Sequence, residues 1–334
     1  MANIVSLMRS NDGIMIQKYY EGTSRIINLS IELGKLLGIV DANYLRKPET
    51  HLRRENRIKT IQSSLKIEGN TLSMDQVSAI FDQKRVIGPP KDIIEVKNAI
   101  SVYSQLSEFD PYDQASYLEA HKLLMKGLVD DAGQYRTKGV GIFKGDQVAH
   151  MAPPAWNVSN LMNNLFSYLM NSEDNQVIKS CVFHYEMEFI HPFMDGNGRM
   201  GRLWQTIILM KENPIFEYLP IELEIQKKQE EYYSVLSASD KEGLCTTFVE
   251  YMLDVIKISL ENLIAEQGKT LNDDERLRYF QQNSDLQAFT RKDYMNVFKT
   301  ISSATATRDL KKGVENGILE RSGENRLSKY KFIK

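Results

Sequence analysis

The chain has 334 residues, of which 42% are hydrophobic, and its 42 lysines and arginines almost balance 44 acidic residues, leaving a net charge of −2. This length predicts two or three domains with a substantial core. The composition argues against fibrous, low-complexity and disulfide-scaffold proteins, because Gly and Pro are not in excess and only two cysteines occur. We expect both, Cys181 and Cys245, to be small core residues.

No stretch approaches eighteen consecutive apolar residues, so no ordinary transmembrane helix is expected. The first residues lack a basic segment followed by a long apolar run, which predicts a cytoplasmic protein rather than a secreted one. The charge is unevenly spread. From Lys269 onward there are 14 basic and nine acidic residues, and a basic terminal module indicates contact with nucleic acid.

Helical periodicity dominates the chain and predicts an all-α fold. A break at Gly88-Pro89-Pro90 separates an N-terminal helical region, residues 1–90, from a central domain, residues 91–267. The predicted helices span residues 23–37, 50–67, 74–82, 91–107, 111–126, 156–171, 177–190, 199–211, 222–236 and 241–264.

The main non-helical stretch runs from about residue 136 to 152. Two β-prone runs flank Lys144-Gly145-Asp146 and predict a hairpin. Two strands alone are only marginally stable, so this hairpin is not expected to form a core sheet. It is either a flap over a site or an incidental surface hairpin.

Residues 268–334 have a pattern of their own. Helices at 273–282, 290–300 and 304–316 precede two β-prone pieces, an order typical of a winged helix-turn-helix. The basic residues of the third helix and of the wing suit contacts with DNA phosphates. A protein-binding module is the alternative, because Asp309 and Glu315 dilute the basic face. The basic residues concerned are Arg308, Lys311, Lys312, Arg321, Arg326 and Lys329.

Residues 191–202 read His-Pro-Phe-Met-Asp-Gly-Asn-Gly-Arg-Met-Gly-Arg. In this segment, His191 is the candidate for a general base. Asp195 can hold Mg²⁺, which favours carboxylate and phosphate oxygens. The small residues that follow, at the start of a predicted helix, can present N–H groups to phosphate. Arg199 and Arg202 lie three apart, so both are expected to reach one polyphosphate.

This dodecamer resembles the signature of Fic-domain proteins at every specified position. The resemblance implies a Fic-type helical bundle that transfers AMP from ATP, with Mg²⁺, to a Ser, Thr or Tyr of a target protein or of itself. It implies that Arg199 grips the γ-phosphate and Arg202 the β-phosphate or the ribose. The implied nucleotide-binding positions are Glu68, Gly196, Asn197, Gly198, Arg199, Met200, Gly201, Arg202 and, close to Tyr232-Tyr233 beside the adenine pocket, Lys228.

A second segment, Ser64-Leu-Lys-Ile-Glu68-Gly69, fits the inhibitory motif of the same family: Ser or Thr, three residues, then Glu followed by Gly or Asn. It lies at the end of the predicted helix at about 50–68. The resemblance implies that Glu68 pairs with Arg199 and displaces the γ-phosphate, with Ser64 steadying the carboxylate. The expected enzyme is therefore autoinhibited.

Three alternatives stay open. The chain could be a regulator that binds DNA or a partner and uses the central domain to sense a nucleotide. It could also use another nucleotide donor, or remove AMP. The complete motif favours an enzyme, because a regulator has no need of His191, Asp195 and both arginines.

In relatives the hairpin aligns a target segment by strand addition. Here Val140, Ile142, Phe143 and Val148 would fit that role, and a homodimer is a further option. Of the other histidines, we expect His121 and His184 to be packed core residues rather than metal ligands. We expect His150 to border the flap.

Overall fold

The computed structural model describes residues 7–9, 15–42, 50–144, 147–267, 273–284, 286, 288–298, 301–323 and 328–333. Most of them are helical, as the periodicity predicts. The helices are α1 (Ser24–Ala42), α2 (Thr50–Ile67), α3 (Met74–Phe81), α4 (Pro90–Tyr103), α5 (Gln114–Leu124), α6 (Val158–Asn171), α7 (Gln176–Ile190), α8 (Asn197–Glu212), α9 (Ile221–Lys227), α10 (Gln229–Glu242), α11 (Thr246–Gln267), α12 (Asp273–Asn283), α13 (Arg291–Val297) and α14 (Ser303–Glu315). The strands are β1 (Leu7–Arg9), β2 (Met15–Gln17), β3 (Gly141–Lys144), β4 (Gln147–Met151), β5 (Leu319–Ser322) and β6 (Lys329–Phe332), and three short 3₁₀ turns lie at Leu106–Glu108, Ala155–Asn157 and Pro214–Tyr218.

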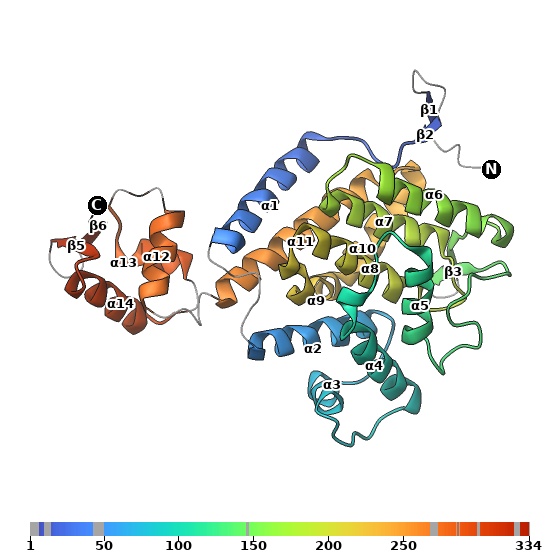
Figure 1. Ribbon diagram of the computed structural model, residues 1–334, viewed down its shortest axis with the longest axis horizontal. Helices are drawn as coiled ribbons and strands as arrows, with labels where there is room; N and C mark the ends of the chain where they lie inside the picture. Colours follow the sequence, from blue (N-terminus) through green and yellow to red (C-terminus); the bar gives the residue numbers. More distant parts are fainter. Residues whose placement is uncertain are drawn as a thin grey trace. The chain divides into compact units, whose positions relative to one another are not determined.

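The chain divides into two compact units (Figure 1). The first comprises residues 1–34 and 47–257, and the second comprises residues 35–46 and 258–334. The finer boundaries near residues 90 and 267 stay predictions. No helix in the described part of the chain is both long enough and apolar enough to cross a membrane.

Helices α7 and α8 pack side by side in the middle of the first unit (Figure 1). Helix α7 is buried along most of its length, and even its polar residues Lys179, Ser180 and His184 lie in the core. Phe183 on α7 and Trp204 on α8 are fully buried in the same core, and each contributes about 1.5–3 kcal/mol or more by leaving water. The loop between these two helices, residues 191–196, is therefore held between rigid elements.

Helix α2 packs on α4, α8 and α9. Its apolar positions Ile58, Ile61 and Leu65 enter the same core as α7 and α8. The next helix, α3, starts with a capping box in which Ser73 and Gln76 bond each other's backbone N–H groups. This packing brings the C-terminal end of α2 to the N-terminus of α8.

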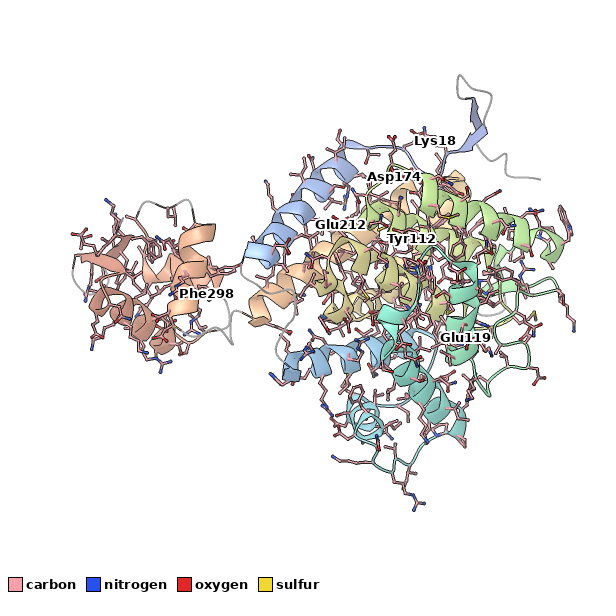
Figure 2. All side chains as sticks on the ribbon, in the orientation of Figure 1. Lys18, Tyr112, Glu119, Asp174, Glu212 and Phe298 are labelled. Atoms are coloured by element: carbon pink, nitrogen blue, oxygen red, sulfur yellow. The ribbon has the colours of Figure 1, made fainter. Side chains whose placement is uncertain are left out.

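The segment before α1 is fastened to the same unit. Figure 2 labels Asp174, which follows α6, and its carboxylate accepts hydrogen bonds from the hydroxyls of Tyr20 (2.8 Å) and Tyr168 (2.6 Å). Tyr112, also labelled there, donates to Gln176 at the start of α7 (3.2 Å). The bonds of Tyr20 and Tyr112 join residues far apart in the sequence.

The structure differs from the predicted elements most clearly at three places, and α1 also runs to Ala42, past its predicted end at residue 37. The predicted helix at 222–236 is two helices, α9 and α10, because the backbone leaves the helical region at Lys228 (φ −121°, ψ 37°). The next helix starts at Thr246 rather than near residue 241, because Gly243 ends α10 in the left-handed conformation (φ 71°). The hairpin of β1 and β2 was not predicted.

The predicted hairpin near 136–152 is present as β3 and β4, paired antiparallel with an irregularity between Ile142 and Phe143. Gly145 and Asp146 at its turn lie outside the described residues, as do the side chains of residues 142–151, including His150 and Val148. Both cysteines are buried and free, as expected for core residues.

In the second unit, α12, α13 and α14 precede the hairpin of β5 and β6, the order that the sequence predicts. Its winged-helix assignment stays a prediction. Asp309 on α14 is fully buried and accepts two hydrogen bonds from Arg276 on α12, at 2.7 and 2.9 Å. The expectation that Asp309 dilutes an exposed basic face is therefore wrong, because its carboxylate points into the core of this unit. Arg326 lies outside the described residues.

Candidate active site

The loop between α7 and α8 starts and ends in unusual backbone conformations. His191 ends α7 in the left-handed region (φ 50°, ψ 58°), and Gly196 precedes α8 with φ 87°. Such a conformation costs a residue with a side chain about 1–3 kcal/mol, and it persists where the surroundings enforce it. At Gly196 only glycine fits, since an added Cβ would also come within 2.7 Å of Met125 Sδ.

Asn197 closes this turn. Its amide oxygen accepts from the N–H of Phe193, and its amide nitrogen donates to the carbonyl of the same residue, both at 2.9 Å. Although Asn197 is one of the predicted nucleotide-binding positions, its side-chain amide is buried and holds the loop. The N-terminus of α8 has no side-chain cap. Its first backbone N–H groups lack helical acceptors, as in known anion sites.

His121 on α5 supports the loop of residues 191–196 by a hydrogen bond and by ring stacking. Its Nδ1 accepts from the N–H of Gly133 (2.8 Å), so its Nε2 carries the proton and donates to the carbonyl of Asp195 (3.0 Å). Its ring stacks on Phe193 with centroids 3.6 Å apart. Burial lowers the pKa of His121 to about 4, so the ring is neutral near pH 7. As expected, His121 is a packed core residue, but one that holds the backbone of the motif.

The ring of His191 is oriented by the end of its own helix. Its Nδ1 lies 3.3 Å from the carbonyl oxygen of Glu188. A carbonyl only accepts, so Nδ1 carries the proton in the neutral ring and the lone pair lies on Nε2. This is the tautomer that a general base needs.

Arg199 faces α4. Its guanidinium donates to Glu95 (3.2 Å) and to Asp195 (2.7 Å). Glu95 is itself buried and accepts from Asn70 (2.8 Å). The Nε of Arg199 is buried and has no hydrogen-bond partner among the described residues. This side chain is thus left with one unsatisfied donor, which is costly inside a protein.

Arg202 faces α2. It is 2% exposed and donates to the hydroxyl of Ser64 (3.1 Å), to the Ser64 carbonyl (3.0 Å) and to the carboxylate of Glu68 (2.8 Å). Burial opposes the charge of Arg202, but the carboxylates of Glu68 and Glu188 outweigh it and raise the pKa. The result is a charge-assisted contact between α8 and the end of α2.

The predicted pair of Glu68 with Arg199 is therefore wrong. Side chains three positions apart on a helix are rotated by about 60° about its axis, so the two arginines face different neighbours. Arg202 meets Glu68, whereas Arg199 meets Glu95. The prediction that Ser64 steadies the carboxylate is corrected as well, since its described bonds are to Arg202.

The carboxylate of Glu68 also lies at the first turn of α8. A Cβ added to Gly198 would overlap Glu68 Oε1 and would lie 3.1 Å from Arg202 and 3.3 Å from Glu188. Only glycine admits these groups so close to the helix N-terminus. Glu68 thus occupies the place where the helix end favours an anion.

A buried hydrogen-bond network lies behind this contact. The hydroxyl of Tyr232 is 3.0 Å from His184 Nε2 and 3.4 Å from Glu188, and His184 Nδ1 is 2.7 Å from Gln205. Burial, with the charge of Glu68, raises the pKa of Glu188 to about 7. Burial lowers the pKa of His184 to about 3, so this histidine is a neutral core residue, as expected.

Asp195 suits a magnesium ion bound together with a nucleotide. Its side chain is 44% exposed, and both of its described hydrogen bonds, from Arg199 and from the N–H of Gly196 (2.6 Å), use Oδ1. Mg²⁺ commonly binds one or two carboxylates plus substrate phosphates. Among the described residues no cluster of three metal-ligating side chains exists, so an all-protein metal cage is not formed there.

The side chains or Cα positions of three of the predicted nucleotide-binding residues make other contacts. Met200 is fully buried in the core, and Gly201 packs on α7, where an added Cβ would come within 3.1 Å of His184. These two residues serve helix packing. Lys228 is half-exposed at the junction of α9 and α10, 3.8 Å from Glu231. None of its described contacts reaches residues 191–202.

Sequence reasoning missed Glu95, Glu188 and Arg136. Glu95 falls on the buried stripe of α4, together with Val96, Ala99 and others, and an acid on an apolar stripe was the available signal. Glu188 lies one turn before His191, on the side of α7 that faces α8. Arg136 lies in the non-helical stretch, where no periodicity marks a buried position.

Known proteins resemble this chain at the level of sequence and fold. The model of the Fic/DOC family matches residues 111–209. The protein adenylyltransferase fic-1 of Caenorhabditis elegans is 28% identical over 285 residues, covering 76% of this chain and 53% of the relative. The protein adenylyltransferase Fic of Aedes aegypti is 27% identical over 249 residues, covering 71% and 47%. The chain thus spans about half the length of these curated relatives.

Solved structures extend the likeness to nearly the whole chain. A Fic family protein from Desulfovibrio desulfuricans G20 is 40% identical, with a TM-score of 0.73, and the match covers 95% of this chain and 98% of that one. Residues 134–508 of Fic-1 from Caenorhabditis elegans match with a TM-score of 0.58 at 21% identity, covering 73% and 75%, which is a likeness of fold. On the first of these matches, the chain belongs to the Fic family.

Proposed function

We propose that this chain is a protein adenylyltransferase, which transfers AMP from ATP to a Ser, Thr or Tyr hydroxyl of a target protein or of itself. The observation that carries the proposal is the carboxylate of Glu68 at the start of α8, 2.8 Å from Arg202. An internal carboxylate bound at an uncapped helix N-terminus marks a site built for an anion. The names of the curated relatives support the same activity.

The reaction needs a base beside that anion site. In the proposed step the hydroxyl oxygen attacks the α-phosphorus of ATP, and the bond between this phosphorus and the bridging oxygen breaks, releasing pyrophosphate. The hydroxyl proton passes to Nε2 of His191. The Glu188 carbonyl, 3.3 Å from Nδ1, keeps the ring in the tautomer that accepts it.

The charges of the triphosphate would meet the start of α8. The N–H groups of Asn197 and Gly198 would face phosphate oxygens there, and Arg202 would donate to a phosphate in place of Glu68 once that carboxylate has left. Arg199 can turn its unsatisfied Nε toward the triphosphate. Asp195 would hold Mg²⁺, which neutralises charge on the phosphates.

Glu68 makes the enzyme autoinhibited in this proposal. Its carboxylate and a phosphate compete for one guanidinium, Arg202, and for one helix end. Its side chain is 31% exposed, so it can leave without opening the core.

The hairpin of β3 and β4 is proposed as the place where the target docks. In the described part of the chain these two strands form a sheet of their own, so each has an outer edge available for strand addition. Main-chain pairing of this kind aligns a target segment with little demand on its side chains. A cytoplasmic location completes the proposal and is compatible with the two free cysteines.

The proposal is tested with ATP labelled at either phosphate end. The Glu68→Gly variant is incubated with Mg²⁺ and a cell lysate, and labelled proteins are separated and weighed by mass spectrometry. We expect label from the α-phosphate and none from the γ-phosphate, with a mass gain corresponding to AMP. If label is transferred from another nucleotide and not from ATP, that nucleotide is the donor. Loss of AMP from a pre-labelled protein would indicate the reverse activity.

A second function, DNA binding by the second unit, is favoured by one observation. Because Asp309 is buried, the exposed face of α14 presents Arg308 and Lys311 without that acid. Lys311 lies 3.5 Å from Glu315 and Lys312 pairs with Asp273, so Arg308 is the main candidate for a phosphate contact.

Arg308→Ala is therefore expected to weaken binding of a duplex DNA by about three- to tenfold. It should also reduce the slope of log affinity against log salt concentration by about one. Fluorescence anisotropy at several salt concentrations measures both, and light scattering of the complex counts the chains on each duplex. The exposed Lys126→Ala, in the first unit, serves as the control. Equal, weak binding by all proteins would remove this function.

A further inference from the structure

Arg136 is a buried cation whose side-chain bonds to the described residues all go to backbone carbonyls. It lies between α5 and β3 and is 2% exposed. Its guanidinium donates to the carbonyls of His191 (2.7 Å), Ile190 (3.2 Å), Lys138 (2.9 Å) and Pro153 (2.5 Å). No carboxylate in the described ranges forms an ion pair with it, and burial lowers its pKa.

Two of these carbonyls end α7, where the helix leaves its last acceptors without partners. A guanidinium at that end satisfies them and complements the negative end of the helix dipole. The backbone N–H of Arg136 also donates to the carbonyl of Pro192 (2.8 Å). Arg136 therefore bonds three successive residues around the left-handed backbone of His191.

The other two carbonyls, of Lys138 and Pro153, flank the hairpin of β3 and β4 on its two sides. One planar group thus joins the residue that carries the base to both ends of the hairpin. Five donors in a fixed fork make this possible, and a lysine ammonium cannot reproduce the geometry. A cap needed only for folding α7 would not have to reach the hairpin.

We infer that Arg136 is a positioning residue: it holds His191 in its left-handed conformation and fixes the hairpin in register with it. The inference rests on the proposed function, because it assumes that the hairpin presents the target hydroxyl to His191. Arg136 itself touches neither reacting group. Its loss should therefore affect the alignment of base and hydroxyl more than the binding of ATP.

The test compares Arg136→Lys and Arg136→Gln in the Glu68→Gly background. We expect kcat for transfer to a protein target to fall about 10- to 100-fold in the Gln variant, as for a small misplacement of reacting groups. The KM for ATP should change less than about threefold, and Lys should restore part of kcat. Arg276→Lys, a change at another buried arginine, in the second unit, should leave both unchanged.

A second measurement needs no activity. In the nucleotide-free protein, hydrogen exchange of peptides covering residues 137–144 and 147–154 should rise in both Arg136 variants and not in Arg276→Lys. Unchanged exchange, unchanged kcat, or a rise in KM for ATP alone would each overturn the inference. If the Glu68→Gly parent transfers nothing, the proposed function fails, and the exchange result alone decides whether Arg136 holds the hairpin.

Discussion

Replacing Glu68 with glycine is expected to raise the rate of AMP transfer by about 10- to 100-fold. The carboxylate of Glu68 takes no part in the proposed transfer. It accepts a hydrogen bond from Arg202 at 2.8 Å, in the place that a phosphate would take. A hydrogen bond to a charged partner contributes about 1.5–3 kcal/mol, and 1.4 kcal/mol corresponds to a factor of ten. Initial rates with α-labelled ATP at several concentrations measure the effect.

The position of Glu68 allows two matched comparisons. Glu68→Gln keeps the shape without the charge, so it should activate less than Glu68→Gly. Lys66→Gly puts a glycine into the last turn of the same helix at an exposed site. It loosens the helix without removing the carboxylate, and it should leave the rate near that of the parent. Equal activation by Lys66→Gly would mean that helix mobility, and not the carboxylate, restrains the enzyme.

The motif could be located from sequence, but its internal pairing could not. Residues 191–202 form a loop and the start of helix α8. They bring together a histidine, a carboxylate and two arginines, as their types and spacing predict. Which carboxylate meets which arginine depends on the rotation of α8 against α2 and α4. That rotation is set by core packing, for example of Trp204 and Leu65. Periodicity identifies a buried face, but it does not identify the neighbour across it.

Local composition also misplaced Asp309 and Lys228. Asp309 lies among basic residues in the sequence, yet its buried bond to Arg276 depends on a helix 33 residues away in the chain. Lys228 lies within a continuous helical pattern, and the backbone break there has no Gly or Pro to reveal it. In both cases long-range packing overrides a local pattern.

The supporting groups of the site were the least predictable. His121 and Arg136 act through backbone carbonyls of the motif, and a carbonyl carries no sequence signal. Their burial becomes meaningful only once Asp195 and His191 are seen beside them. In the proposed mechanism these residues orient His191. The contribution of His191 itself to the rate of AMP transfer can be measured directly.

Replacing His191 with alanine in the Glu68→Gly background is expected to lower AMP transfer by about 10²- to 10⁴-fold, the usual contribution of a general base. The affinity for ATP should stay within about threefold, because the phosphate contacts come from α8 and its arginines. Folding should be preserved as well. The backbone bonds of His191 to Met187 and Arg136 do not involve its ring. Alanine, like histidine, would adopt the left-handed backbone conformation that these bonds hold.

The measurement pairs transfer rates with nucleotide binding by calorimetry on the same preparations. His51→Ala is the matched control, since His51 is an exposed histidine at the start of α2, 3.6 Å from Glu55 on the same helix. Its transfer rate should equal that of the parent. A His191→Ala protein that binds ATP and still transfers AMP at more than a tenth of the parental rate would show that another group accepts the proton. The tautomer set by the Glu188 carbonyl would then have no catalytic meaning.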